Sequence, residues 1–291
     1  MICKKDVNKD LHFNLIFLLT NSIIKQKGGK QMALPKLYKA FYKEKIFNFS
    51  EVLKKFKEEK YSEGYLRKRL NDLLTAGYLG SVGARGLYYI IPQESSREKF
   101  VPDKFLIGAK LSPAGIIGYH SALELHGASY SSYNSIYIIA QKYFRPFKFQ
   151  GIKYQTIKGD VSFGVETILR EGLKVRLTNR ERTIIEGING LKHIGGLEEY
   201  FKSIELFPSI DFGQLIIYLK RFNKKIFYAK IGFILSYFEK RWSFPENYRE
   251  EIKAHLGTRI NYLSDKREEA KLDKEWKLMV PVRLKSLLGE Y

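Results

Sequence analysis

The chain has 291 residues, which is enough for two domains of ordinary size. Its 44% apolar and 14% aromatic content excludes a disordered chain, and the single cysteine, Cys3, excludes both an internal disulfide and a zinc site made of cysteines. The formal net charge of +20, from 51 Lys and Arg against 31 Asp and Glu, favours a polyanionic partner, either nucleic acid or an anionic membrane surface.

An apolar segment near the N-terminus predicts a helical extension over residues 1–33, with its helix at 11–26. The run Phe13–Leu19 loosely resembles the core of a signal peptide. Asp6 and Asp10 stand where such a peptide is basic, however, and no small-residue cleavage site follows. The run is also too short to span a bilayer. We therefore expect a helix that packs on the rest of the protein, a cytoplasmic location and no membrane partner.

Residues 34–91 are predicted to form a small domain with a characteristic order of elements. Twelve Lys and Arg stand against six Asp and Glu here, a net charge of +6. The order is helix, short strand, helix, helix and hairpin, which is typical of a winged helix-turn-helix. The expected elements are a helix from Pro35 through Leu37–Lys45, an extended piece Ile46–Phe49, a helix Glu51–Lys60 capped by Ser50, a helix Ser62–Thr75, and strands Tyr78–Val82 and Leu87–Ile91.

The helix Ser62–Thr75 would be the reading helix of such a domain. Ser62 is a good N-cap, and Gly77 is a plausible residue to end the helix. A stripe of leucines at helical spacing predicts the buried face: Leu66, Leu70, Leu73 and Leu74. The opposite face would carry Gly64, Lys68, Asn71, Asp72 and Thr75, flanked by Tyr65 and Arg67.

Nine residues are predicted to contact duplex DNA: Lys54, Lys55, Lys57, Ser62, Tyr65, Arg67, Lys68, Asn71 and Arg85. Arg67, Lys68 and Asn71 would reach base edges, because Arg and Lys suit guanine and Asn suits adenine. The three lysines of the preceding helix would contact phosphates, which adds affinity without sequence choice. Arg85, at the tip of the turn between the two strands, would enter a minor groove or touch phosphate.

A polar linker, residues 92–102, is expected to lead into a larger domain at 103–291, with a division into lobes 103–210 and 211–291 as an option. Short strands and helices alternate in its first part, and a mainly helical part follows Asp211, so the fold class is α+β. The expected elements are a helix Gly115–His126, strands Ser135–Ala140, Gly151–Ile157 and Leu173–Leu177, a helix with capping-box spacing from Thr178 to about Gly187, and helices Leu197–Ile204 and Tyr228–Lys240.

Recognised catalytic motifs are missing from the sequence. It contains no phosphate-binding G-x-x-x-x-G-K-[ST], no H-E-x-x-H and no G-x-S-x-G, so we predict no catalytic residue, no metal site and no cofactor. His120 and His126 are six positions apart and would face different sides of a helix, so we expect them to pack or hydrogen-bond internally. Glu181 to Thr183 could form an acid–base cluster, but a first helical turn stabilised by Glu181 is the favoured interpretation.

Several segments together resemble one known family, the AbiEi-type antitoxins. Gly118–Gly127, GYHSALELHG, resembles the family's "hSALelHGL" signature, and Val175–Gly187 resembles its strand–turn–helix "ERTllD" element. Gly195–Glu199 resembles the glycine-pair helix that follows. Ala229–Leu235 and Lys274–Pro281 are similar to the later helix and the closing strand. The resemblance covers roughly residues 34–285.

There are two departures from the family pattern. Glu186 stands where Asp is more usual, and the first 31 residues have no clear counterpart. The shared motifs contain His120, Ser121, His126, Glu181, Arg182 and Thr183, whose role is open between fold element and functional site.

The resemblance implies a promoter-binding autorepressor, the antitoxin half of a type IV, abortive-infection toxin–antitoxin operon. Such proteins bind inverted repeats upstream of their own operon through the winged helix. The second domain counteracts a nucleotidyltransferase-like toxin, usually without a stable complex, and the protein would be a monomer or weak dimer. Two alternatives remain: a winged-helix regulator whose second domain senses a small ligand, and, less favoured, a nucleic-acid-processing enzyme.

Overall fold

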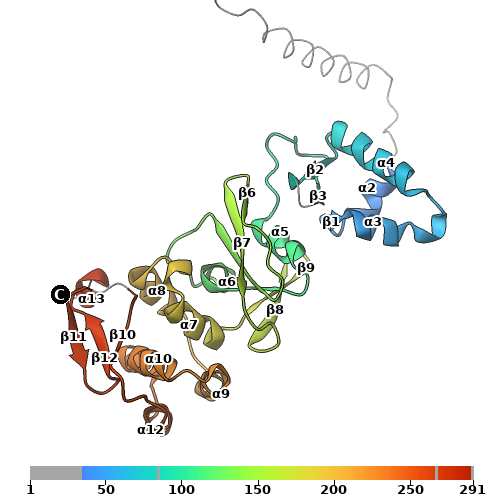
Figure 1. Cartoon of the computed structure of the whole chain (residues 1–291). Helices are drawn as coiled ribbons and strands as arrows, with labels where there is room; N and C mark the ends of the chain where they lie inside the picture. The colour runs from blue at the N-terminus through green and yellow to red at the C-terminus, as the bar shows by residue number, and fades with distance from the viewer. Residues whose placement is uncertain (1–34, 84–85, 266–267, 290–291) are drawn as a thin grey trace, which may run out of the picture.

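The computed structural model of the chain describes residues 35–83, 86–265 and 268–289. Within these ranges the chain has a mixed α+β fold with twelve helices and three sheets (Figure 1). The predicted extension at 1–33 and the predicted wing-tip cation Arg85 lie outside the described residues. None of the described helices combines the length and the apolarity that a bilayer crossing requires.

A small unit at the N-terminal end combines short helices with one antiparallel sheet. Its elements are α2 (Lys36–Phe41), β1 (Ile46–Asn48), α3 (Phe49–Lys55), η1 (Lys57–Glu59), α4 (Glu63–Thr75), β2 (Leu79–Ser81) and β3 (Leu87–Ile90). The strand order is β1-β3-β2. The three helices enclose one core, in which Tyr38, Phe47 and Leu70 are almost fully buried.

Three of the predicted helix ends in this unit are wrong. The helix predicted over Glu51–Lys60 ends at Lys55 and is followed by the short 3-10 helix η1. The first helix ends at Phe41 rather than Lys45, because the backbone at Lys45 is left-handed (φ +56°) and cannot continue an α-helix. The cap of α3 is Asn48 rather than Ser50. The Asn48 side chain accepts a hydrogen bond from the Glu51 amide, and the Glu51 carboxylate accepts one from the Asn48 amide. The predicted N-cap of α4, Ser62, is confirmed.

A six-stranded mixed sheet forms the centre of the molecule. Its elements are α5 (Lys104–Leu111), β4 (Ile116–Ile117), α6 (Tyr119–Leu125), β5 (Ser135–Ala140), β6 (Phe147–Phe149), β7 (Ile152–Lys158), β8 (Val165–Arg170) and β9 (Leu173–Thr178). The strand order is β6-β7-β5-β4-β9-β8, with parallel pairing of β5 with β7 and of β4 with β9. Ile136 and Ile138 face α5, whereas Tyr137, between them, faces Tyr119 of α6.

The predicted helix Gly115–His126 is wrong over its first four residues. Ile116 and Ile117 instead pair with β5 as the short strand β4. An apolar run of this length does not distinguish a strand from a buried helix. The chain bends after it, because Gly118 is extended and lies against Ile139, while Tyr119 has a left-handed backbone (φ +54°). The helix α6 therefore starts only at Tyr119.

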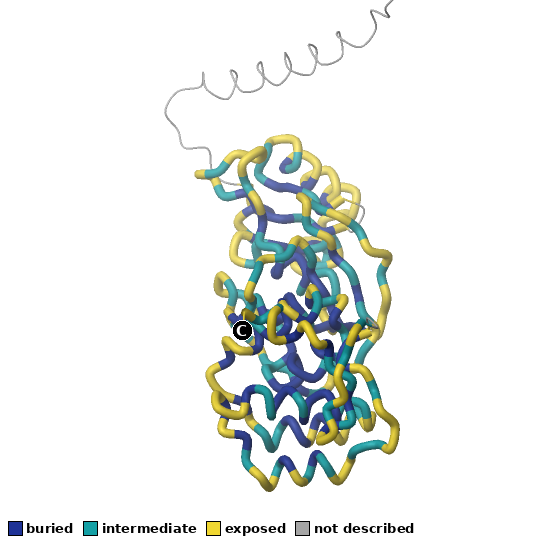
Figure 2. Tube along the Cα trace, turned by 90° about the vertical axis from the view of Figure 1, so that its left-hand side faces the viewer, coloured by how far each residue is buried: buried dark blue, intermediate teal, exposed yellow. Residues whose placement is uncertain are grey.

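The N-terminal unit packs directly on the central sheet. Side chains of its strands, among them Leu87 and Tyr89, share one hydrophobic core with Phe105 and Ile107 of α5. Ion pairs between Lys45 and Glu171 (2.7 Å) and between Lys110 and Glu51 (2.5 Å) flank this junction. Figure 2 shows buried residues both in the N-terminal unit and in the rest of the described chain, whereas the linker 92–101 contains none.

A helical layer with a small sheet follows β9. Its elements are α7 (Arg180–Asn189), η3 (Leu191–His193), α8 (Leu197–Ile204), α9 (Phe212–Phe222), α10 (Lys225–Tyr237), α11 (Glu239–Trp242), α12 (Glu246–Ala254), β10 (Asn261–Tyr262), β11 (Ala270–Asp273), β12 (Leu278–Pro281) and α13 (Leu284–Leu287). The strand order is β10-β12-β11. Asn179 rather than Thr178 caps α7, because its side chain accepts a hydrogen bond from the Arg182 amide.

One large core joins α7–α10 and α12 to the small sheet. Trp276, which precedes β12, is fully buried, and its ring occupies the space beside Gly232 of α10. Its indole N–H donates to Ser236 Oγ (3.0 Å). The expectation of a mainly helical C-terminal part therefore holds for 211–254, and a sheet closes the chain beyond it.

Candidate nucleic-acid interface and a buried polar network

Helix α4 separates an apolar face from a polar one, as its spacing predicts. Leu66, Leu70 and Leu73 are 5% exposed or less, and Leu74 is partly buried. The predicted outer face carries side chains that are exposed in the structure: Gly64, Lys68, Asn71, Asp72 and Thr75. Ser62 fixes the start of the helix, since its Oγ accepts a hydrogen bond from the Tyr65 amide (3.2 Å). The leucines therefore orient the polar face away from the protein.

The two arginines of α4 have intramolecular partners, whereas Lys68 does not. Arg67 pairs with Glu63 (2.6 Å) and lies over the ring of Phe49, 4.0 Å from its centroid. Arg69 pairs with Asp72 (3.1 Å), which offsets the one acid on the outer face. Within the described residues, neither Lys68 nor Asn71 makes a hydrogen bond or ion pair, so both are free to contact a ligand.

The other predicted DNA contacts have different surroundings. Tyr65 stacks on Tyr61, with ring centroids 4.9 Å apart, and lines a groove toward α2 instead of standing on the outer face. Lys55 pairs with Glu44 and lies 4.8 Å from the centroid of a neighbouring aromatic ring. Lys54 and Lys57 are exposed. Lys68 and Asn71 therefore carry the strongest case for base contact, and Lys54 and Lys57 for phosphate contact.

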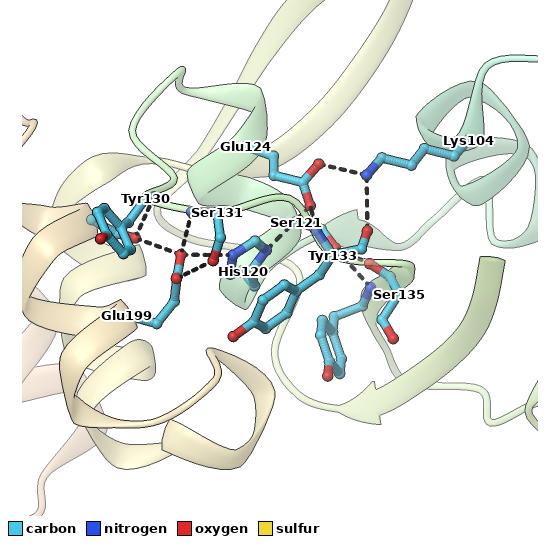
Figure 3. A network of polar contacts seen from close by, with 11 residues as sticks. Lys104, His120, Ser121, Glu124, Tyr130, Ser131, Tyr133, Ser135 and Glu199 are labelled. Atoms are coloured by element: carbon cyan, nitrogen blue, oxygen red, sulfur yellow. Dashed lines mark hydrogen bonds and ion pairs between the residues drawn. The ribbon is translucent and has the colours of Figure 1, made fainter. Parts of the chain in front are cut away.

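His120 of the "hSALelHGL" segment is the centre of a buried polar network (Figure 3). The ring is fully buried on α6, and its Nδ1 lies 3.2 Å from a carboxylate oxygen of Glu124. Its Nε2 lies 3.0 Å from a carboxylate oxygen of Glu199, which comes from α8. The Tyr133 ring stacks on the imidazole, with centroids 4.0 Å apart and planes 8° from parallel. Only a doubly protonated ring can donate to both carboxylates.

Both carboxylates have further donors. Glu199 also accepts hydrogen bonds from the amide and hydroxyl of Ser131 and from Ser203 Oγ (3.0 Å). Burial alone would raise the pKa of Glu199, but these donors outweigh burial and hold it below its usual value. The pKa of Glu124 is lowered in the same way, against burial, by His120 and Lys104. The network is therefore a chain of charge-assisted hydrogen bonds between two anions and a central ring.

The remaining residues of this segment support the sheet and the neighbouring helix. Ser121 Oγ donates to the Ser135 carbonyl (3.2 Å) and accepts from the Tyr137 amide (3.0 Å), which attaches α6 to β5. His126 Nε2 lies 2.8 Å from the carbonyl oxygen of Thr178, at the end of β9. Burial lowers the pKa of His126 and outweighs the opposing effect of that carbonyl. The expected internal hydrogen bonding of both histidines is confirmed.

Several polar side chains of the "ERTllD" segment stabilise the fold. Glu181 accepts a hydrogen bond from the Asp211 amide (3.0 Å), which connects α7 to the start of α9. Arg182 is fully buried and donates to the carbonyls of Asp160 (2.6 Å) and Phe163 (2.5 Å). Thr183 Oγ1 lies 2.7 Å from Thr178 Oγ1. Among the described residues, no residue of this segment shares a hydrogen bond with His120. The two segments are joined instead by His126, whose Nε2 lies 2.8 Å from the Thr178 carbonyl oxygen.

One carboxylate oxygen beside Arg182 has no partner. Glu186 Oε1 accepts from Arg182, with an Nε distance of 3.0 Å, whereas its Oε2 is buried without a hydrogen bond. Burial raises the pKa of Glu186, and Arg182 opposes that rise without cancelling it.

Several residues of the polar network have no direct signal in the sequence. Glu199, Ser131 and Lys104 come from three distant segments, and only the folded sheet brings them to His120. The described residues contain no group of three or more His, Cys, Asp or Glu side chains arranged to hold a metal ion. Because its ring is fully buried and both nitrogens are engaged, His120 is placed to hold α5, α6 and α8 together.

Comparison with known proteins places the fold. No family model matches the chain, and no curated protein matches it. Among solved structures, the Rv2827c protein from Mycobacterium tuberculosis matches with a TM-score of 0.57 at 10% sequence identity. The match covers 88% of this chain and 96% of that one. The chain is therefore similar in overall fold to the Rv2827c protein.

Proposed function

We propose that this protein is a DNA-binding transcriptional repressor and that residues 35–91 form its winged helix-turn-helix. The observation that carries the proposal is the outer face of α4, where Lys68 and Asn71 are exposed and without intramolecular partners among the described residues. In this arrangement α4 enters the major groove, α3 crosses the backbone, and β2 and β3 form the wing. The net charge of +20 supports a polyanionic partner.

A gel-shift titration on the inverted repeats upstream of the protein's own gene tests this proposal. We expect Lys68→Ala and Asn71→Ala to weaken specific binding by roughly 5- to 150-fold, since a base contact contributes about 1–3 kcal/mol of discrimination. Lys271→Ala is the matched control, because that exposed lysine lies on β11, at the other end of the molecule (Figure 1). Equal affinity for operator and scrambled DNA at both low and high salt would refute the proposal.

The second part of the proposal concerns the domain after residue 103. We propose that it acts as the antitoxin of a type IV toxin–antitoxin operon and counteracts a nucleotidyltransferase-like toxin. The support is the order of the motifs Gly118–Gly127 and Val175–Gly187, which in the fold form the closely packed helices α6 and α7. This role is separate from DNA binding, so a variant that has lost operator affinity should still protect cells.

Co-expression with the product of the neighbouring gene measures that protection. We expect the Lys68→Ala protein to restore growth as well as the unaltered protein does. The antitoxin proposal fails if the intact protein gives no protection, whatever its affinity for DNA.

A further inference from the structure

A groove of apolar and aromatic side chains lies between α2 and α4 and has a volume of about 360 Å³. Leu37, Phe56, Leu66 and Leu73 line it, each at most 6% exposed. These side chains belong to the core of the N-terminal unit, so the groove opens directly onto that core.

Two tyrosines form a wall of this groove and remain uncovered. Tyr61 and Tyr65 are 39% and 41% exposed, and their rings stack on each other at 4.9 Å. The groove borders the outer face of α4 at Asp72, but Lys68 and Asn71 are not part of its lining, which from α4 is Tyr65, Leu66, Arg69, Asp72 and Leu73. An uncovered aromatic pair next to an apolar floor is typical of a surface that binds another segment of protein.

We propose that this groove is the docking site of the chain's own segment Leu11–Ile24. Nine of these 14 residues are apolar, and the sequence predicts a helix here. A helix of 14 residues is about 21 Å long. With that apolar content it needs a surface on which to bury its side chains. The segment lies outside the described residues, and the groove is an apolar surface next to the point where the described chain begins.

The connection between segment and groove has a suitable length. Pro35, the first described residue, itself lines the groove. Ten residues, 25–34, separate it from Ile24. They can span up to roughly 33 Å when extended, so the segment can fold back over α2 and α4. A tether this short gives an effective concentration in the millimolar range, which favours docking within one chain over capture of a second copy.

Spin labelling tests docking directly. Cys3 is the only cysteine, so the Cys3→Ser, Asn21→Cys protein carries one nitroxide within the segment. We expect that label to broaden the amide signals of Tyr65 and Ala76 at the groove and to leave the signal of Lys271 on β11 unchanged. A second variant, Ile16→Asp with Leu19→Asp in the same labelled background, should abolish the broadening, whereas the matched polar change Asn14→Asp should preserve it.

A mixed sample separates docking within one chain from docking between copies. In this sample the nitroxide is attached to protein without ¹⁵N, and the amide signals are read from a second, ¹⁵N-labelled protein that carries no nitroxide. Broadening at Tyr65 and Ala76 in this sample would mean that a second copy supplies the segment, which overturns the proposal. Absence of broadening in the singly labelled protein overturns it as well. The test reads distance alone and does not depend on DNA binding.

Discussion

Replacing Glu199 separates the charge of the buried network from its hydrogen bonds. The carboxylate is 6% exposed, and its Oε1 accepts from His120, the Ser131 amide and Ser203, while its Oε2 accepts from the Ser131 hydroxyl. In Glu199→Gln, the amide oxygen can take the place of Oε1 and the amide nitrogen can donate to the Ser131 hydroxyl. The variant therefore keeps every hydrogen-bonded pair, with the direction of the Ser131 hydroxyl bond reversed, and loses the charge.

The two substitutions at this position differ in expected cost. Glu199→Gln should lower the free energy of unfolding by about 1–2 kcal/mol, the difference between charged and neutral hydrogen bonds summed over the site. Glu199→Ala should cost about 3–5 kcal/mol, because it leaves the buried His120 ring and the Ser131 amide without their acceptor. Glu198, the next residue on α8, is the control. It is 47% exposed, and Lys202 is its one ion-pair partner among the described residues, so Glu198→Ala should change stability by less than about 0.5 kcal/mol.

Urea denaturation followed by tryptophan fluorescence measures these differences, since Trp242 and Trp276 lie in the same core as α8. The pH dependence adds a second readout. The pKa of Glu199 is lowered by folding, so its contribution is present above the ordinary value of 4.5 and is lost as the pH falls below it. The gap between the unaltered protein and Glu199→Gln should therefore shrink in acid. An equal loss of unfolding free energy in Glu199→Ala and Glu198→Ala would refute the conclusion that this network holds the helices together.

Two further predictions concern other buried positions. Glu186 has a pKa raised by burial, so folding binds a proton between the ordinary value of 4.5 and the raised one, and stability falls as the pH rises through that window. Glu186→Gln should remove this pH dependence of the free energy of unfolding. An unchanged dependence in the variant would contradict the prediction. Gly232→Ala would place a methyl group 2.2 Å from ring atoms of the buried Trp276, so we expect a net loss of about 1–3 kcal/mol despite the better helix propensity of Ala. Gly64→Ala on α4, with open space around its new methyl group, is the control in thermal unfolding, and equal melting temperatures for the two variants would show that the ring moves aside.

Periodic patterns predicted the elements of this fold best where one face of a helix is buried. The leucine stripe of α4 and the boundaries of α8 are confirmed, because a 3.6-residue period leaves a clear trace in the sequence. The short run Ile116–Ile117 was assigned to a helix instead of a strand, since its strand character depends on pairing with β5, about twenty residues later. The N-cap prediction was wrong where two candidate residues stand close together, as with Asn48 and Ser50. Only the backbone geometry of the folded chain decides which of them caps the helix.

The candidate sites divide in the same way. The exposed face of α4 follows from helical spacing, so Lys68 and Asn71 were identified from the sequence. The network around His120 could not be identified from the sequence, because Glu199 is 79 positions away and only the fold brings the two residues together. The sequence predicts that His120 packs or hydrogen-bonds internally, but it does not indicate that Arg182 is fully buried.

The shared core between the N-terminal unit and α5 affects how this protein can be recombined. Leu87 and Tyr89 on one side meet Phe105 and Ile107 on the other, so the boundary is a hydrophobic seam. A chimera that exchanges the first 91 residues for those of another protein would have to match that seam as well as the linker. Under the proposed function, DNA specificity should therefore change more readily by substitutions on the outer face of α4 than by exchange of the whole N-terminal unit.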